Sequence, residues 1–191
     1  MAEPAGTDPP YAPERECFSS FTHQEIWDRV HEALDPGALA AAAAAWQSNA
    51  AAVADAFAVF TDTTRREFER WSGYSANAAR QATREFIAAG DETHEACRAL
   101  QRLMEGNTEA AQTLRSALAP PQPYRPLDDP AAEAVHGGRR RMDHDIAAVA
   151  AAADAQDAMH SIYNPTLPAS GDRVPRFPGT STGTGGGSPR R

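Results

Sequence analysis

The sequence predicts an all-α fold: an elongated helical bundle built on a long antiparallel helical hairpin, with a short N-terminal helix and an additional C-terminal helix. Alanine is abundant in the 191 residues, and aromatic side chains make up only 7%. Apolar side chains recur at heptad-like spacings along two long stretches, while prolines cluster after the second stretch and prolines and glycines occur near both ends. Such limited apolar surface is best buried between closely packed helices.

The N-terminal part predicts a short helix after an irregular segment. Residues 1–20 carry prolines and charges without periodicity, so we expect a disordered N-terminus, followed by a helical domain over 21–165. Thr22 and Glu25 have the spacing of a capping box. One apolar stripe then follows, made of Ile26, Trp27, Val30 and Leu34.

A long second helix is expected from about 36 to about 70. Asp35 is a suitable N-cap and Pro36 a suitable first residue, and the helix would be roughly 50 Å long. Its near-heptad stripe contains Leu39, Trp46, Val53, Phe57, Phe60, Phe68 and Trp71. This face requires a partner helix.

The partner is the helix expected over 74–119. Gly90 and Gly106 predict local bends in it rather than ends, because helix-compatible sequence follows each. Apolar positions on this helix fall into two registers, Phe86, Leu100 and Leu114 in one and Cys97, Met104 and Leu118 close to the other. We therefore predict a hairpin seam made of Trp46, Val53, Phe57, Phe60, Phe68, Phe86, Leu100, Met104 and Leu114.

A Pro-rich linker is expected over 120–130, because proline lacks the N–H of a helix interior. Asp129-Pro130 then begins a last helix, which Gly137-Gly138 could interrupt. Its apolar stripe runs to about Ile162 through Met142, Ile146, Val149, Ala153 and Met159. We expect this helix to stop before Asn164-Pro165, and residues 166–191 to form a disordered Pro/Gly/Ser/Thr-rich tail.

The reversal between the two long helices falls at Trp71-Ser72-Gly73. Two helices of similar length with so short a connection must be antiparallel neighbours, and glycine permits the positive φ that a tight reversal needs. At a hairpin tip, Trp71 cannot bury its whole ring against one helix. It is therefore either a staple across the turn or an exposed recognition anchor.

A short helix, the stretch DPGALAAAAAAW at 35–46, an Ala-rich helix and then WSG opening a second long helix follow one another in this order. In this order the chain resembles the Trp-x-Gly (WxG) substrates of type VII (ESX) secretion systems, in their PPE-domain and EspB-like branch. The resemblance covers roughly residues 22–165. It implies a secreted or cell-surface helical interaction or structural protein, exported through the Trp-x-Gly signal without a Sec or Tat signal peptide.

The resemblance also implies partners and recognition residues. The partners would be a small PE-like or WxG-type helical protein, further copies of the chain, or both, together with the ATPase of the secretion machinery. Trp71 and Gly73 would form one half of the signal, and the other half is a Tyr-x-x-x-Asp/Glu pattern, matched in letters by Tyr124 and Asp128. Pro123 and Pro126 would keep these two side chains off a common helical face. A partner carrying its own Tyr-x-x-x-Asp/Glu is the alternative source.

Other classes of function are weaker interpretations. A cytoplasmic adaptor, chaperone-like toward a larger exported toxin, would share the hairpin. We expect no enzyme, cofactor or metal: the pairs Asp28/His31, Asp91/His94 and Asp157/His160 only loosely resemble di-iron ligands. The net charge of −8 disfavours nucleic acid, and no helix combines a basic face with a strong apolar face for a membrane surface. Cys17 and Cys97 fit no disulfide framework.

Overall fold

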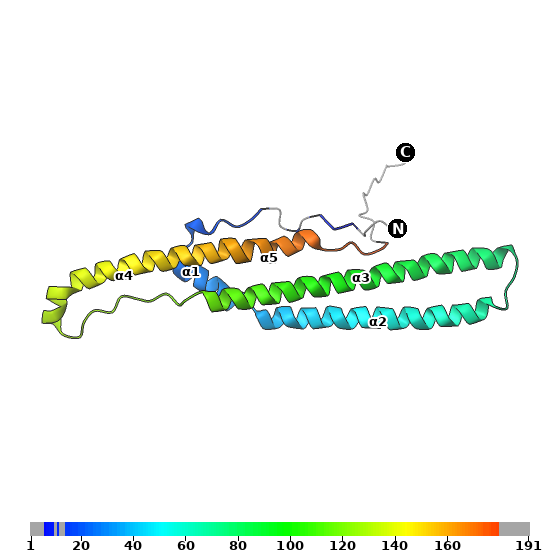
Figure 1. Cartoon of the computed structure of the whole chain (residues 1–191), viewed down its shortest axis with the longest axis horizontal. Coiled ribbons are helices and arrows are strands. Elements are labelled where there is room, and N and C mark those ends of the chain that lie inside the picture. The colour runs from blue at the N-terminus through cyan, green and yellow to red at the C-terminus, as the bar shows by residue number, and fades with distance from the viewer. Residues whose placement is uncertain (1–5, 10, 12–13, 180–191) are drawn as a thin grey trace, which may run out of the picture. The chain divides into compact units, whose positions relative to one another are not determined.

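The computed structural model describes residues 6–9, 11 and 14–179. Within this part the chain is helical and contains no strand, only an isolated bridge between Thr7 and Pro175. The α-helices are α1 His23–Asp28, α2 Pro36–Phe68, α3 Tyr74–Ala117, α4 Pro130–Ala158 and α5 Asn164–Ser170 (Figure 1). Short 3-10 or π turns are η1 Phe18–Ser20, η2 Arg29–Ala33, η3 Met159–Tyr163 and η4 Gly171–Arg173. The all-α class and the two long helices are as predicted.

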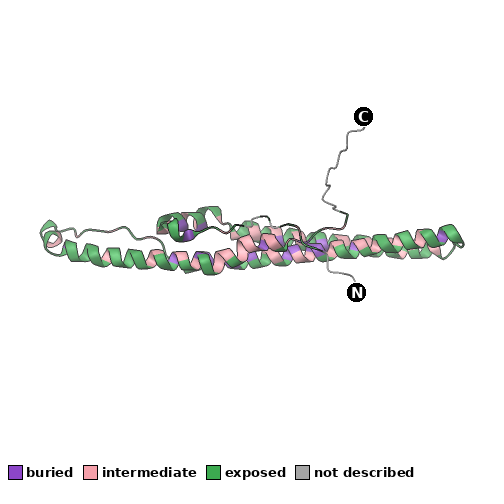
Figure 2. Cartoon of the chain, turned by 90° about the horizontal axis from the view of Figure 1, so that it is seen from above, coloured by how far each residue is buried: buried purple, intermediate pink, exposed green. Residues whose placement is uncertain are grey.

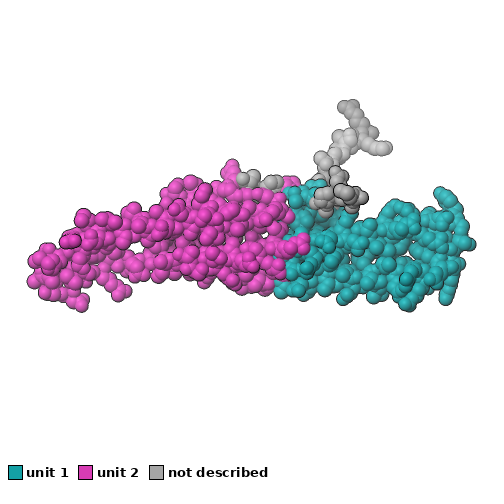
Figure 3. All heavy atoms as spheres, in the orientation of Figure 1, with its two compact units in different colours: residues 1–8, 44–101, 174–191 teal, residues 9–43, 102–173 magenta. Residues whose placement is uncertain are grey.

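The chain divides into two compact units (Figure 3). Unit 1 contains residues 1–8, 44–101 and 174–191, and unit 2 contains residues 9–43 and 102–173. Each unit therefore holds a part of α2 and a part of α3. Each has its own packing, described separately below.

Three helix starts follow from local side-chain capping. The Thr22 hydroxyl accepts from the Glu25 N–H (3.2 Å), and the Glu25 carboxylate accepts from the Thr22 N–H (2.7 Å), which confirms the predicted capping box. Asp129 Oδ1 accepts from the Ala131 N–H (3.0 Å), with Pro130 as the first helical residue. Asp35 Oδ1 accepts from the Gly37 N–H (2.8 Å) at the start of α2. Each bond satisfies a donor that a helix N-terminus otherwise leaves free.

Unit 2 contains the largest fully buried side chains of the described residues, Ile26, Leu114 and Val30. Its core is completed by Phe18, Leu118, Ala155 and Met159. Leu114 was predicted at the seam against α2, and the structure instead places it in this core. The reason is that α2 begins only at Pro36, so that α1 and η2 supply the partners of the last turns of α3.

One prediction about unit 2 is wrong in the described residues, and an interruption that was left open does not occur. The helix does not stop before Asn164-Pro165, because the π turn η3 leads into α5, with the Asn164 N–H donating to the Met159 carbonyl. A proline early in a new helical segment removes no bond that the segment needs. α4 also passes Gly137-Gly138 without a break.

The expected disorder of 1–20 and 166–191 does not hold for the described parts of these segments. Phe18 is buried in the unit 2 core, and Arg15 forms an ion pair with Asp172. Ser170, also buried, accepts from the Asn107 amide (3.0 Å). The remaining residues of the two segments, 1–5, 10, 12–13 and 180–191, lie outside the described residues.

In unit 1, residues of α2 and α3 lie side by side (Figure 1). Phe57 contacts Phe86, with ring centroids 5.1 Å apart, and Phe60 contacts Phe86 edge-on at 5.2 Å. The ring of Phe57 also covers Gly90, where an added Cβ would lie 2.3 Å from a ring carbon. Nearer the turn, Arg80 contacts Phe68. α3 passes Gly90 and Gly106 without an end, as predicted.

Several predicted seam residues occupy different surroundings from those expected. Trp46 stacks on Phe177 (6.2 Å between centroids), a residue of the segment that was assigned to the tail. Phe86 is 54% exposed although its ring contacts Phe57 and Phe60, whereas Gly90 is buried against Phe57. Leu100 is buried in unit 1, and Met104 is half-buried in unit 2. Val53, Phe57, Phe60 and Phe68 are all half-buried along one face of α2.

Candidate recognition site at the WSG turn

The connection between α2 and α3 is a tight turn over residues 69–73. The Arg70 N–H donates to the Glu67 carbonyl (3.2 Å) and the Trp71 N–H to the Phe68 carbonyl (3.3 Å). Gly73 follows with φ +93°, and its carbonyl accepts from the Asn77 N–H (3.2 Å) in the first turn of α3. A side chain at Gly73 would be strained in this left-handed region, which confirms the predicted reason for glycine here.

Trp71 is supported on one side and open on the other. Its ring meets the ring of Phe68 edge-on, with centroids 5.8 Å apart, and the residue is 53% exposed. Tyr74, three residues further, is 90% exposed. The indole thus packs on Phe68 at the end of α2, and about half of the surface of Trp71 remains exposed.

Arg80 holds the turn, and the sequence interpretation did not include it. One guanidinium nitrogen, Nη2, donates to the carbonyls of Phe68 (2.5 Å) and Trp71 (2.6 Å). The guanidinium also lies over the Phe68 ring, 5.7 Å from its centroid. Arg80 therefore adds a second donor to the Phe68 carbonyl, supplies a donor to the Trp71 carbonyl, and places a positive charge at the negative end of α2. The sequence feature that could have identified Arg80 is an arginine two turns into the helix that follows the WSG turn.

A groove runs along one side of the contact between α2 and α3 in unit 1. Next to the turn it encloses about 380 Å³, and further along about 430 Å³. The two stretches share Thr61, Arg65 and Ile87. Its floor is apolar, with Phe68 near the turn and Val53 and Phe57 further away.

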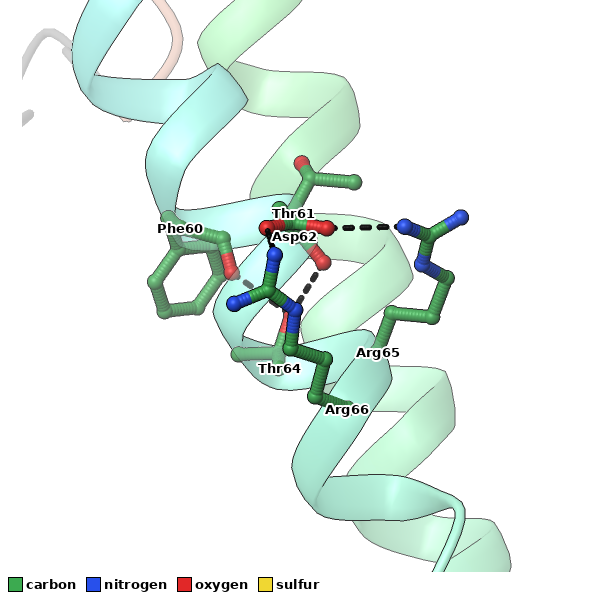
Figure 4. A network of polar contacts seen from close by, with 6 residues as sticks. All are labelled: Phe60, Thr61, Asp62, Thr64, Arg65 and Arg66. Atoms are coloured by element: carbon green, nitrogen blue, oxygen red, sulfur yellow. Dashed lines mark hydrogen bonds and ion pairs between the residues drawn. The ribbon is translucent and has the colours of Figure 1, made fainter.

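Charged side chains line the rim of this groove. Asp62 accepts from Arg65 (2.7 Å) and also forms an ion pair with Arg66, while the Thr64 hydroxyl donates to the Phe60 carbonyl (2.8 Å) (Figure 4). Asp62 is thus matched by arginines of its own helix. An apolar floor with a charged rim is the arrangement that receives an amphipathic helix.

Tyr124 and Asp128, the predicted second half of the signal, lie in unit 2, in a segment that is not helical. The Tyr124 hydroxyl donates to the Glu133 carboxylate (2.8 Å), and this bond raises the pKa of Tyr124. Arg141 lies over the Tyr124 ring at 4.7 Å. Tyr124 therefore fastens the linker to α4, and Asp128 is exposed just before the N-cap Asp129.

The Asp/His pairs do not form metal sites in the part of the chain that the structure describes, where no group of three or more His, Cys, Asp or Glu side chains is placed to hold an ion. His31 stacks on Trp27 (3.5 Å), and Asp28 accepts from Gln24 (2.7 Å). Asp91 and His94 lie on the groove wall in unit 1. Asp157 and His160 are both exposed.

The cysteines are free thiols, Cys17 exposed and Cys97 buried. Burial raises the pKa of Cys97, which makes its thiol less reactive. Among the described helices, none is long and apolar enough to cross a membrane.

Comparisons with known proteins give no match for this chain among protein families, curated proteins or solved structures.

Proposed function

We propose that this chain is a helical interaction module exported by a type VII (ESX) secretion system, with the WSG turn of an α2–α3 hairpin as the recognised element. The observation that carries the proposal is a tryptophan that is 53% exposed on a tightly held turn. Gly73 and Arg80 fix the backbone on either side of it. The chain would act at the cell surface or outside the cell as a binding or structural component rather than as an enzyme.

A tryptophan on a rigid turn, such as Trp71, is well suited to bind a partner protein for a physical reason. A rigid aromatic side chain loses little conformational entropy on binding, and tryptophan is among the residues that contribute most to binding free energy at interfaces. The apolar groove with its charged rim begins beside this turn. A small helical partner, PE-like or WxG-type, could lie in the groove and cover Trp71 with its end.

The second half of the signal would come from that partner. The hydroxyl of Tyr124 is bound to Glu133, so exposing Tyr124 to the secretion machinery would break this bond between the linker and α4. We therefore assign the Tyr-x-x-x-Asp/Glu pattern to the partner. The ATPase of the secretion machinery would then recognise the pair of proteins rather than this chain alone.

The test compares Trp71→Ala with Tyr74→Ala, a neighbouring and even more exposed aromatic outside the motif. Loss of an anchor of this kind costs at least about 2 kcal/mol, roughly thirtyfold in affinity. Export, measured as the fraction of the protein in the culture medium, should fall for Trp71→Ala and stay unchanged for Tyr74→Ala. Circular dichroism should show full helicity for both.

Two outcomes would contradict the proposal. Normal export of a fully helical Trp71→Ala variant would leave Trp71 as a structural staple. Retention of the unaltered protein in the cell, with partner capture still dependent on Trp71, would favour a cytoplasmic adaptor for a larger exported toxin.

A further inference from the structure

Most residues of α4 between 135 and 149 are exposed (Figure 2), and they include an apolar stripe in unit 2. Val135, Met142, Ile146 and Val149 are between 58% and 75% exposed. Their spacings of seven, four and three residues put them on one face of the helix, with Gly138 on the same face. A shallow groove of about 500 Å³ lies along this face, lined by Gly138, Arg141, Met142, Asp145, Ile146 and Val149. The stripe has the form of a coiled-coil seam.

The linker packs on other sides of α4 and leaves this stripe open. Its contacts reach Glu133, Gly137, Arg140, Arg141 and His144. On a helical projection, Glu133, Gly137, Arg140 and His144 lie on the side opposite Met142, and Arg141 lies on the flank. The linker therefore packs on the face of α4 opposite the apolar stripe.

The charges beside the stripe are arranged symmetrically about Met142 with opposite signs. Arg139 and Arg141 precede Met142 by three residues and one, and Asp143 and Asp145 follow it by one and three. Arg139 and Asp143 lie on one flank of the stripe, and Arg141 and Asp145 on the other. Arg139 and Asp143 are 87% and 65% exposed, with a separation of 4.0 Å between their charged atoms.

We propose that two copies of this chain pair through α4, antiparallel, about a two-fold axis at Met142. With a rise of about 1.5 Å per residue, Arg139 of one copy then lies within about 3 Å along the axis of Asp143 in the other, on the same flank. Arg141 and Asp145 form the equivalent pairs on the opposite flank. Each flank then holds two pairs of opposite charge and one pair of like charge, Asp143 with Asp143 on one side and Arg141 with Arg141 on the other. Four attractive contacts therefore outnumber two repulsive ones, and the two-fold axis repeats each of them.

The apolar side chains match in the same register. Val135 of one copy lies opposite Val149 of the other at both ends, and the two Met142 side chains meet at the centre. Ile146 falls opposite Gly138, where nothing lies within 4 Å of an added Cβ, so the isoleucine has room. The paired segment from Val135 to Val149 is about 21 Å long. A parallel pair in register would instead bring Arg139 near Arg141 and Asp143 near Asp145, with Arg141 near Asp143 as the one attractive pair on each flank. Four repulsive contacts would then outnumber two attractive ones.

The first experiment exchanges charges on the full chain. Asp143→Arg and Arg139→Asp each make one flank carry a single sign, so each variant alone should lose self-association, with its dimer Kd raised at least roughly tenfold. An equimolar mixture of the two variants should associate again, since their flanks are complementary. Sedimentation equilibrium measures this over a wide concentration range. Asp55→Arg and Arg102→Asp, the same charge changes at exposed positions elsewhere, are the controls and should dimerise normally.

A second experiment determines orientation, in a Cys17→Ser background. Chains with Val135→Cys should form disulfides with chains carrying Val149→Cys, and neither variant should crosslink efficiently to itself. Self-crosslinking of Val135→Cys would show a parallel pair and overturn the proposal. An unaltered chain that is monomeric at every concentration would overturn it too, and would leave the stripe for the helix of a different protein. The inference does not rest on the proposed export, because a dimer can form whether or not the chain is secreted.

Discussion

Two glycines in α3 have opposite surroundings. An added Cβ at Gly90 would lie 2.3 to 2.5 Å from three carbons of the Phe57 ring, whereas at Gly106 nothing lies within 4 Å. Gly90 is buried and Gly106 exposed. The first glycine therefore allows α2 and α3 to approach closely, and the second only weakens the helix that contains it.

We expect Gly90→Ala and Gly106→Ala to change stability in opposite directions. Gly90→Ala should destabilise the protein by about 1–3 kcal/mol, because the Phe57 ring must move, while Gly106→Ala should stabilise it by up to about 1 kcal/mol through helix propensity. Denaturant unfolding measures both. A second comparison in a Phe57→Ala background should remove the penalty at Gly90, and a penalty that persists there would show that the ring is not its cause.

The roles of the three glycines Gly73, Gly90 and Gly106 could be predicted from the sequence only in part. It explained Gly73, because a short connection between two long helices requires a local reversal, and φ +93° agrees. It gave Gly90 and Gly106 the same role, because both interrupt an apolar pattern in the same way. The difference depends on Phe57, which is far away in the sequence and whose rotamer depends on packing.

At the scale of elements, arginines of α3 cap the C-terminal ends of preceding helical elements. Arg80 donates to carbonyls at the end of α2, and Arg115 donates to the carbonyls of Val30 (3.2 Å), His31 (3.1 Å) and Leu34 (2.8 Å) at the end of η2. Arg80 thus joins α3 to the end of α2 in unit 1, and Arg115 joins α3 to the end of η2 in unit 2. A cation at these positions also matches the negative end of a helix.

Arg80→Ala should therefore loosen the turn. It removes two charge-assisted hydrogen bonds to half-exposed carbonyls, and we expect a loss of about 1–3 kcal/mol in unfolding free energy. Arg84→Ala is the control, since the Arg84 guanidinium donates only to the exposed Gln81 side chain. The fluorescence of Trp71 should respond to Arg80→Ala and not to Arg84→Ala. Equal effects of the two variants would mean that the bonds to Phe68 and Trp71 contribute little.

The linker between α3 and α4 is held by titratable groups. The Leu127 N–H donates to Glu133 (2.8 Å) and, with the bond from Tyr124 and the nearby arginines, lowers the pKa of Glu133 below its ordinary 4.5. His144 contacts the Gln122 carbonyl (2.8 Å) and Asp145 (3.2 Å), which raise its pKa above its ordinary 6.5. A neutral imidazole has one N–H and cannot donate to both.

The two shifts predict a pH window for the linker. The lowered pKa of Glu133 contributes stability that is present above pH 4.5 and lost as pH falls through the folded-state value. The raised pKa of His144 contributes stability that is present below pH 6.5 and lost as pH rises through its folded-state value. The NMR shift of the Leu127 amide should follow the acid transition, which Glu133→Gln should abolish. His144→Gln should abolish the transition at higher pH that comes from His144, measured as the NMR shift of the Tyr124 ring, and should leave the acid transition of Glu133 unchanged.

Helix starts were more predictable than helix ends and continuations. Thr22, Asp35 and Asp129 act within their own first turn, so their letters suffice to identify them. The continuation past Pro165 depends on a π turn and on the burial of Ser170 against Asn107, which no local pattern indicates. Met142, Ile146 and Val149 were predicted to share one apolar face with Ala153 and Met159, but such a stripe identifies a face and not what covers it: Met159 is buried in the unit 2 core, and the other three large side chains are exposed.

Over the whole molecule, large buried side chains are unevenly distributed. Ile26, Leu114 and Val30 belong to unit 2, whereas the buried apolar residues described in unit 1 are mostly small: Ala50, Ala76, Ala96, Cys97 and Leu100. Burial of large side chains contributes about 1.5–3 kcal/mol each. Unit 2 should therefore be the more stable unit. Leu114 was predicted to belong to the seam of α2 and α3, because an apolar stripe does not show that α1 and η2 contact this residue.

This difference predicts local unfolding of unit 1 before unit 2. Phe57→Asp places a carboxylate among Phe60, Phe86 and Gly90, and the half-burial of this position limits the expected cost to about 2 kcal/mol. Hydrogen exchange read by mass spectrometry should speed up over 44–101 and change little in α1 and α4. Val59→Asp, on the same helix but 68% exposed, is the control and should leave exchange unchanged.

Leu114→Ala should act on the other unit and cost about 2–5 kcal/mol, because its side chain is fully buried. If Phe57→Asp instead speeds up exchange equally in both units, the chain unfolds as one cooperative body and the stability of unit 1 cannot be separated from that of unit 2.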